Sequence, residues 1–266
     1  MDVNTPDRAG RINADGLDVY YEGYGGGPGR PLVILHGGFM SSAALGPLPA
    51  ALAVDRPVIA FDLEGHGRTR DLDRPLSTDQ MGRDVGAAIK ALALGPVDLL
   101  GFSMGGAAAQ RTAFHHPELV RRLVLVSTSY SNDGFQPGIT AMWPSMSAEG
   151  FKGTPMEGLY AQTAPEPERW PVFVDKMKQM MIGFEGWPKS DLQAIKAPTL
   201  LMLGDADLIR LDYAVEMFGL LGGGQGAGMV GSSPSRLAVL PGVTHFDILY
   251  RLDLLLPTIQ PFLAEA

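Results

Sequence analysis

Short apolar runs recur along this chain, and longer segments of mixed polarity separate them. The runs are rich in Val, Ile and Leu without polar alternation, which is typical of strands covered on both faces in a parallel sheet. The segments between them place apolar residues three or four positions apart, as an amphipathic helix does. This alternation predicts an α/β fold, with a mostly parallel central sheet and helices on both faces. The predicted strands are 31–35, 56–61, 96–102, 123–126, 197–204 and 236–240.

Helices and turns are predicted around these strands. Ser77 and Thr78 should cap a helix that continues to about Leu94. Asp15-Gly16 predicts a hairpin turn between two short strands, and residues 1–10 before it are expected to form a loose arm. Further helices are predicted at 43–53, from Ser103 to about 115–117, at 212–221 and at the end of the chain, with a loop at 222–235.

The alternation stops at about Tyr130. Residues 131–190 show no clear strand, and they hold all three tryptophans and six of the 13 methionines. A helical insertion with its own small core explains this composition, with Met177, Met180 and Met181 as its expected core. Adaptable methionines and large aromatic rings also suit an apolar binding cavity, so we expect the insertion to act as a lid. The predicted organisation is a core of residues 1–130 and 191–266 with a helical cap at 131–190.

Composition narrows the possible functions. A chain of 266 residues, 45% of them hydrophobic, can bury one sizeable core. The formal net charge of −8, without any basic run, argues against binding nucleic acid or an anionic membrane. Cysteine is absent, which excludes disulfides and thiolate chemistry. Residues 1–7 do not look like a secretory signal, and no apolar run approaches the ~20 residues that cross a bilayer, so we expect a soluble, cytoplasmic protein.

The central motif is Gly101-Phe102-Ser103-Met104-Gly105, where an apolar run ends and helix-forming residues begin. The pattern predicts a sharp strand-to-helix turn that presents the Ser103 hydroxyl beside a helix N-terminus. Glycines stand on either side because strand and helix approach closely there. The G-x-S-x-G pattern alone is weak, and a helix merely capped by Ser103 is the alternative. In its strand–turn–helix context it predicts a nucleophile elbow.

A serine nucleophile needs a base and an acid that orients the base. In open α/β sheets such groups gather at the carboxyl ends of strands. Asp207 follows one late predicted strand and His245 follows the next, in the chain order Ser, Asp, His.

With these residues in place, the chain resembles the α/β-hydrolase superfamily, in its cap-bearing esterase and lactonase branch, over about residues 12–262. The resemblance implies Ser103 as nucleophile, His245 as base and then acid, and Asp207 as orienter. Asp205 competes for the last role, and Asp133 is a more distant candidate. The matched pieces are His36-Gly37-Gly38, Asp62 with Gly65-His66-Gly67, the Ser103 motif, Gly204-Asp205-Ala206-Asp207 and Gly242-Val243-Thr244-His245.

The same resemblance suggests where the oxyanion and the substrate would bind. The backbone N–H of Met104 and that of Gly38, with Phe39 as an alternative to Gly38, are the expected oxyanion donors. His36 and His66 are expected to support loops rather than to act as bases. The expected substrate contacts are Phe39, Phe102, Trp143, Met146 and Phe246.

Two other patterns are better explained without a ligand. Residues 226–231 match G-x-G-x-x-G, but no strand precedes them and no helix is expected to follow, so dinucleotide binding is not predicted. His115 and His116 are neighbours on a helix and point about 100° apart, so they do not suggest a metal site. We expect no metal and no cofactor.

The leading functional prediction is hydrolysis of a small carboxylic ester or lactone through an acyl-enzyme. A cofactor-free perhydrolase or haloperoxidase and a carbon–carbon bond hydrolase would use the same triad. A ligand receptor with slow turnover is the alternative from another class of function. The sequence makes no prediction of the oligomeric state.

Overall fold

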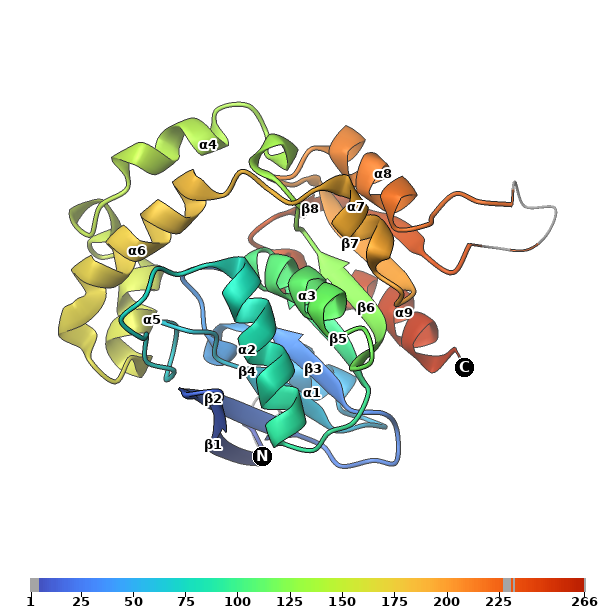
Figure 1. Ribbon diagram of the computed structural model, residues 1–266, viewed down its shortest axis with the longest axis horizontal. Helices are drawn as coiled ribbons and strands as arrows, with labels where there is room; N and C mark the ends of the chain where they lie inside the picture. Colours follow the sequence, from blue (N-terminus) through green and yellow to red (C-terminus); the bar gives the residue numbers. More distant parts are fainter. Residues whose placement is uncertain (1–4, 227–230, 232, 266) are drawn as a thin grey trace.

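The central sheet carries the fold in the computed structural model, which describes residues 5–226, 231 and 233–265 (Figure 1). Its strand order is β1-β2-β4-β3-β5-β6-β7-β8. The strands β3 to β8 pair in parallel, and β2 joins β1 and β4 antiparallel. The predicted α/β fold with a mostly parallel sheet is therefore confirmed. The strands are β1 Arg8–Ala14, β2 Leu17–Tyr24, β3 Leu32–Leu35, β4 Val58–Phe61, β5 Val97–Phe102, β6 Val120–Val126, β7 Thr199–Ala206 and β8 Arg236–Thr244.

Helices cover both faces of this sheet, as predicted. Alternate strand residues enter two separate apolar clusters because successive side chains point to opposite faces. Helices α2 and α3 lie side by side on one face, whereas α1 and α9 cover the other (Figure 1). The helices of this part are η1 Ser42–Ala44, α1 Leu48–Leu52, α2 Thr78–Ala91, α3 Met104–His115, α8 Leu211–Leu220, η6 Ile248–Tyr250 and α9 Leu252–Ala264.

Two local predictions near the start of the chain are wrong. The loose arm is shorter than expected, because Arg8–Gly10 already pair with β2 across the hairpin. The hairpin itself is confirmed, with Asp15 and Gly16 both at positive φ. The helix expected at 43–53 is broken into η1 and α1, because Gly46 adopts a φ of +59° and Pro47 follows it.

Residues 131–190 form a set of short helices that sits at one end of the sheet (Figure 1). No strand occurs among these residues, as expected. An aromatic cluster joins them to the core: the ring of Phe39 lies 4.9 Å from that of Phe151 and 5.6 Å from that of Phe173. The exact limits of a cap at 131 and 190 stay a prediction. The helices are η2 Asn132–Gly134, α4 Ile139–Met142, η3 Trp143–Ser145, η4 Glu149–Phe151, α5 Pro155–Thr163, η5 Pro167–Arg169 and α6 Trp170–Gly183. Helix α7 Lys189–Ala194 begins at the end of this segment but lies beside α3 and α8 (Figure 1).

Ion pairs add a second attachment between these helices and the core. Asp71, in the loop before α2, accepts a 2.6 Å hydrogen bond from Lys176 and a 3.0 Å bond from Arg169. Because Asp71 and Lys176 are largely buried, solvent screens this pair less than it screens an exposed one. The cluster fixes α6 over the loop that precedes α2.

Most of the G-x-G-x-x-G stretch at 226–231 lies outside the described residues. Within the part of the chain that the structure describes, every helix is too short or too polar to cross a bilayer.

Candidate active site

Ser103 sits at the turn between β5 and α3, as predicted. Its φ of +52° lies in the left-handed region, which non-glycine residues rarely adopt. An added Cβ at Gly101 would overlap the Gly105 carbonyl, and one at Gly105 would overlap the His36 carbonyl. Both glycines are therefore required by the close approach of strand and helix. The strained turn holds the serine side chain at the carboxyl edge of the sheet.

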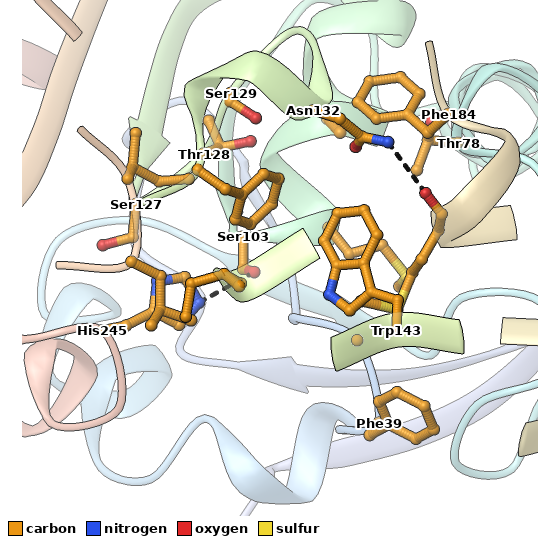
Figure 2. Close-up of a pocket in the computed structure, with 18 of the residues that line it drawn as sticks. Phe39, Thr78, Ser103, Ser127, Thr128, Ser129, Asn132, Trp143, Phe184 and His245 are labelled. Carbon is orange, nitrogen blue, oxygen red and sulfur yellow. Dashed lines mark hydrogen bonds between the residues drawn. The ribbon is translucent and has the colours of Figure 1, made fainter. Parts of the chain in front are cut away.

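His245 links Ser103 to Asp207. Its Nε2 lies 3.1 Å from Ser103 Oγ, and its Nδ1 lies 2.8 Å from Asp207 Oδ1. Figure 2 shows the contact between His245 and Ser103 on one wall of a cavity. The side chains of His245 and Asp207 are buried, at 7% and 0% exposed. The structure thus brings together the three residues that the sequence placed after separate strands.

Asp207 is held as a carboxylate by several donors. The Ile209 N–H donates to Oδ1 at 3.0 Å, and the Ser127 hydroxyl donates to Oδ2 at 2.5 Å. Burial alone would raise the pKa of Asp207, but the hydrogen bond and charge of His245 and the bonds from Ser127 and Ile209 outweigh it and lower that pKa. The buried, ionised carboxylate therefore lies ready to accept the Nδ1–H of His245.

Ser127 is a site residue that sequence reasoning missed. It follows β6 directly, is fully buried and adopts a φ of +52°. Its position at the carboxyl end of a parallel strand, the same edge as Asp207, was the one available signal. A short serine side chain next to a strand is common, so that signal is weak.

The competing carboxylates have other partners. Asp205 is exposed and accepts hydrogen bonds from the amides of Gly242 and Val243, so it supports the turn that leads to His245. Asp133, the more distant candidate, is exposed on η2. Among the three candidates for the orienting acid, Asp207 alone contacts His245.

The two expected oxyanion donors both face the cavity. Met104 is the first residue of α3, where N–H groups have no partner within the helix. Gly38 lies on the loop after β3, and an added Cβ there would lie 3.1 Å from the Met177 methyl. Phe39, the alternative, has a φ of +58°. The backbone of this loop is thus tightly packed opposite the N-terminus of α3.

His36 and His66 hold the surrounding loops. His36 Nε2 accepts the Leu63 N–H at 3.0 Å, and its Nδ1–H donates to the Gly37 carbonyl at 2.8 Å. Burial lowers the pKa of His36, and burial with the neighbouring His36 lowers the pKa of His66 to about 3. Both imidazoles are therefore neutral and act as uncharged hydrogen-bonding groups.

Asp62 clamps two loops beside this pair. Its carboxylate accepts the N–H of Ser42 and the N–H of Arg68, each at 2.7 Å. Gly67 is needed because an added Cβ would overlap this carboxylate. The motif residues around Asp62 and His66 therefore support the loop after β3, which carries Gly38.

A cavity of about 210 Å³ opens in front of Ser103. Apolar side chains from α4, η3 and α6 form its roof, and Trp143 stands opposite Ser103 (Figure 2). His245 is the one ionisable side chain among the described lining residues. The lining residues are Gly38, Phe39, Thr78, Ser103, Met104, Ala107, Ser127, Thr128, Ser129, Asn132, Phe135, Ile139, Trp143, Met156, Met177, Met180, Met181, Phe184, Leu208, Ile209, His245 and Phe246.

The predicted substrate contacts divide into two groups. Phe39, Trp143 and Phe246 line the cavity, and Phe246 is 67% exposed at its mouth. Phe102 does not line it, because its ring points into the opposite apolar cluster and packs 5.1 Å from the His245 ring. Met146 does not line it either, because the chain leaves the cavity after η3.

The three methionines of α6 behave differently from expectation. Met177, Met180 and Met181 were expected to form the core of the insertion, but all three line the cavity. Met177 is 1% exposed and also packs in the main apolar cluster, so it serves both roles. Spacing identifies a helix face but not which neighbour that face contacts.

The remaining histidines do not form a metal site. His115 contacts Asp79, whereas His116 contacts Lys90 and Glu118. No group of three metal-ligating side chains gathers anywhere in the described residues.

A nucleophile elbow, a Ser–His–Asp arrangement and a mostly parallel sheet together define a hydrolase fold of the α/β class. The chain belongs to the α/β hydrolase family, whose model matches residues 32–255. It is a hydrolase.

Three similar proteins illustrate the range of this family. A pyrrolizixenacetamide deacetylase of Xenorhabdus hominickii is 39% identical over 123 residues, 46% of each chain. A 2-hydroxy-6-oxo-6-(2'-aminophenyl)hexa-2,4-dienoic acid hydrolase of Metapseudomonas resinovorans is 34% identical over 122 residues, 44% of this chain and 41% of the relative. The match spans less than half the length of these two relatives. The structure of Est816, described as an N-acyl homoserine lactone degrading enzyme, has a TM-score of 0.72 and 22% identity, with 95% of this chain and 100% of that chain covered.

Proposed function

We propose that this hydrolase cleaves small, uncharged carboxylic esters or lactones through an acyl-enzyme on Ser103. The observation that carries the proposal is the continuous contact from Asp207 through His245 to Ser103, which ends at an apolar cavity. His245 Nε2 takes the Ser103 proton as the hydroxyl attacks the carbonyl carbon. Asp207 accepts the Nδ1–H of the imidazole, which leaves Nε2 free to face the serine. The carboxylate also stabilises the imidazolium that forms.

The tetrahedral intermediate places a negative charge on the former carbonyl oxygen. The N–H groups of Met104 and Gly38, at the N-terminus of α3 and on the facing loop, are the proposed donors to it. His245 then gives its proton to the leaving alkoxide, and the alcohol departs. In the second half His245 removes a proton from water, which attacks the acyl-enzyme and regenerates Ser103.

The charge of the cavity favours an ester or lactone over a carbon–carbon cleavage product. The Metapseudomonas resinovorans relative is named for a dienoic acid, whose carboxylate needs a cation or several donors when it leaves water. No Lys or Arg occurs among the described residues that line this cavity. The lining is mostly apolar, with uncharged hydroxyl and amide groups of Thr78, Thr128, Ser129 and Asn132, and this combination matches a neutral acyl or alcohol group.

A panel of p-nitrophenyl esters and lactones of increasing chain length tests the proposal, with Ser103→Ala as the matched control. We expect saturable hydrolysis by the wild type, and a loss of roughly 10⁴-fold or more in kcat for the variant. Ala should preserve the fold, since it keeps a Cβ at the same φ, and an unchanged Tm checks this. Activity above a tenth of wild type in Ser103→Ala would rule out the proposed nucleophile. Binding without turnover would favour a receptor, and peroxide-dependent halogenation would favour a haloperoxidase.

A further inference from the structure

A second hollow lies directly beside the cavity, between the start of α2 and the end of α6. Its volume is about 590 Å³, and we call it the α2–α6 cleft. Thr78, Met180 and Phe184 line both the cavity and the cleft. Figure 2 shows Thr78 and Phe184 on the side of the cavity away from His245. The cleft residues are Asp73, Arg74, Pro75, Leu76, Ser77, Thr78, Asp79, Asp175, Lys176, Gln179, Met180, Gly183, Phe184 and Trp187.

The cavity at Ser103 is small for a complete ligand site. Its volume of about 210 Å³ lies below the roughly 300–1,000 Å³ typical of pockets that enclose a small molecule. The adjoining cleft is more than twice as large. A substrate longer than a short-chain ester must therefore continue out of the cavity, and the shared wall gives it a place to do so.

We propose that the α2–α6 cleft binds the distal part of an elongated ester or lactone whose carbonyl lies at Ser103, and that it prefers a positively charged end. The inference rests on the function proposed above. Met180 and Phe184, four residues apart, form the passage between the two spaces. Met180 is unbranched and can change rotamer, and Phe184 follows the last residue of α6 as its C-cap, so we expect both side chains to move aside for a substrate.

The charged residues of the cleft indicate that it prefers a positively charged substrate end. Its two cations are already neutralised: Arg74 bonds Glu64 and Asp84 at 2.7 Å each, and Lys176 bonds Asp71 at 2.6 Å. By contrast, the Asp73 carboxylate is exposed and has no partner among the described residues.

The other two carboxylates of the cleft, Asp79 and Asp175, are already paired. Asp79 contacts Arg111 and His115, and Asp175 contacts Lys178. A terminal ammonium can therefore pair with Asp73, whereas a terminal carboxylate would have to compete for cations that already have carboxylate partners.

Gly183 allows the cleft to be blocked without touching the catalytic residues. It lines the cleft and not the cavity, and an added Cβ there meets no atom within 4 Å. Gly183→Leu therefore places its Cβ without a clash and adds an apolar side chain to the cleft lining. Gly158 on α5 is the matched control, because an added Cβ there is equally unobstructed and the residue lies on a different hollow. Gly183 is the last residue of α6 and Gly158 lies inside α5, so the Tm of each variant is measured alongside its kinetics.

The experiment compares kcat/KM for p-nitrophenyl acetate with that for medium-chain esters that end in an ammonium, extended in the acyl part in one series and in the alcohol part in another. We expect Gly183→Leu to lower the ratio of extended to short substrate by about tenfold in one series. Gly158→Leu should leave the ratio unchanged. If Gly183→Leu changes neither series while acetate is still hydrolysed, the cleft proposal fails and the proposed function stands. If the wild type hydrolyses no ester, both fail.

Asp73→Asn tests the charge preference separately. Wild-type enzyme should favour the ammonium-ended ester over a carboxylate-ended ester of equal length, and the variant should reduce that preference by about threefold at low salt. Added salt should reduce it in the wild type as well. A preference for the carboxylate end in the wild type would overturn the assigned substrate class.

Discussion

The strand side and the helical side of the cavity are built in different ways. On the strand side, hydrogen bonds hold Asp207 and His245, and glycines force the turn at Ser103. On the helical side, the wall consists of apolar side chains such as Trp143 and Met180 that pack without directional bonds. The difference indicates that the strand side determines the reaction, whereas the helical side determines which substrates fit. Substitutions on the first side should change kcat, and those on the second should change KM and chain-length preference.

The largest effect on kcat is expected from Asp207, the second of two carboxylates at the end of β7. Asp207→Asn should lower kcat by roughly 10⁴-fold, because an amide at this position favours the wrong imidazole tautomer. Asp205→Asn should have little effect, since an amide oxygen can still accept the N–H groups of Gly242 and Val243. Steady-state kinetics of the two variants compares them directly. The reverse order would transfer the orienting role to Asp205.

A smaller loss of kcat is expected from substitution of Ser127. Ser127→Ala removes the 2.5 Å hydrogen bond to Asp207, and kcat should fall about tenfold with little change in KM. Ser127→Gly also lacks the hydroxyl but relieves the left-handed backbone, so it should match the alanine variant in kcat and exceed it in Tm. Wild-type kcat in both variants would show that the hydroxyl does not position Asp207.

Ser127→Ala should also change how the stability of the fold responds to acid. Because the pKa of Asp207 is lowered on folding, its contribution to stability is present above the ordinary value of 3.8 and is lost as the pH falls through the lowered value. Loss of the Ser127 bond raises the folded-state pKa and reduces this contribution. Acid unfolding of Ser127→Ala, followed by circular dichroism, should therefore begin at a higher pH than that of the wild type. Identical acid transitions would contradict this linkage.

The smallest effect is expected on the helical side. Trp143→Ala enlarges the cavity, so KM for short esters should rise severalfold and the preference should move to bulkier substrates. Met146→Ala is the control three residues away, because Met146 does not line the cavity. Equal chain-length profiles for both variants and the wild type would show that the helical side does not select substrates.

The two sides also differ in how far the sequence predicts them. The turn at Ser103 and the sheet follow from short apolar runs, glycine spacing and strand ends, all of which act locally. The positions of Asp207 and His245 follow from the rule that parallel strands end at one edge. The roles of Met177, Met180 and Met181 could not be predicted, because helical spacing does not reveal what a face packs against. The left-handed backbone of Ser127, whose hydroxyl contacts Asp207, depends on surroundings that are distant in sequence, whereas Gly46-Pro47 was a local signal for the helix break.

Covalent labelling of Ser103 tests the central claim most directly. Diethyl p-nitrophenyl phosphate transfers its phosphoryl group to an activated serine and releases p-nitrophenolate, and mass spectrometry of the digested protein locates the group. The proposed mechanism predicts one diethylphosphoryl group on the peptide that contains Ser103, loss of ester hydrolysis in parallel with labelling, and no label in Ser103→Ala. Inactivation with the label on a different residue, or full ester hydrolysis after Ser103 is labelled, would contradict it.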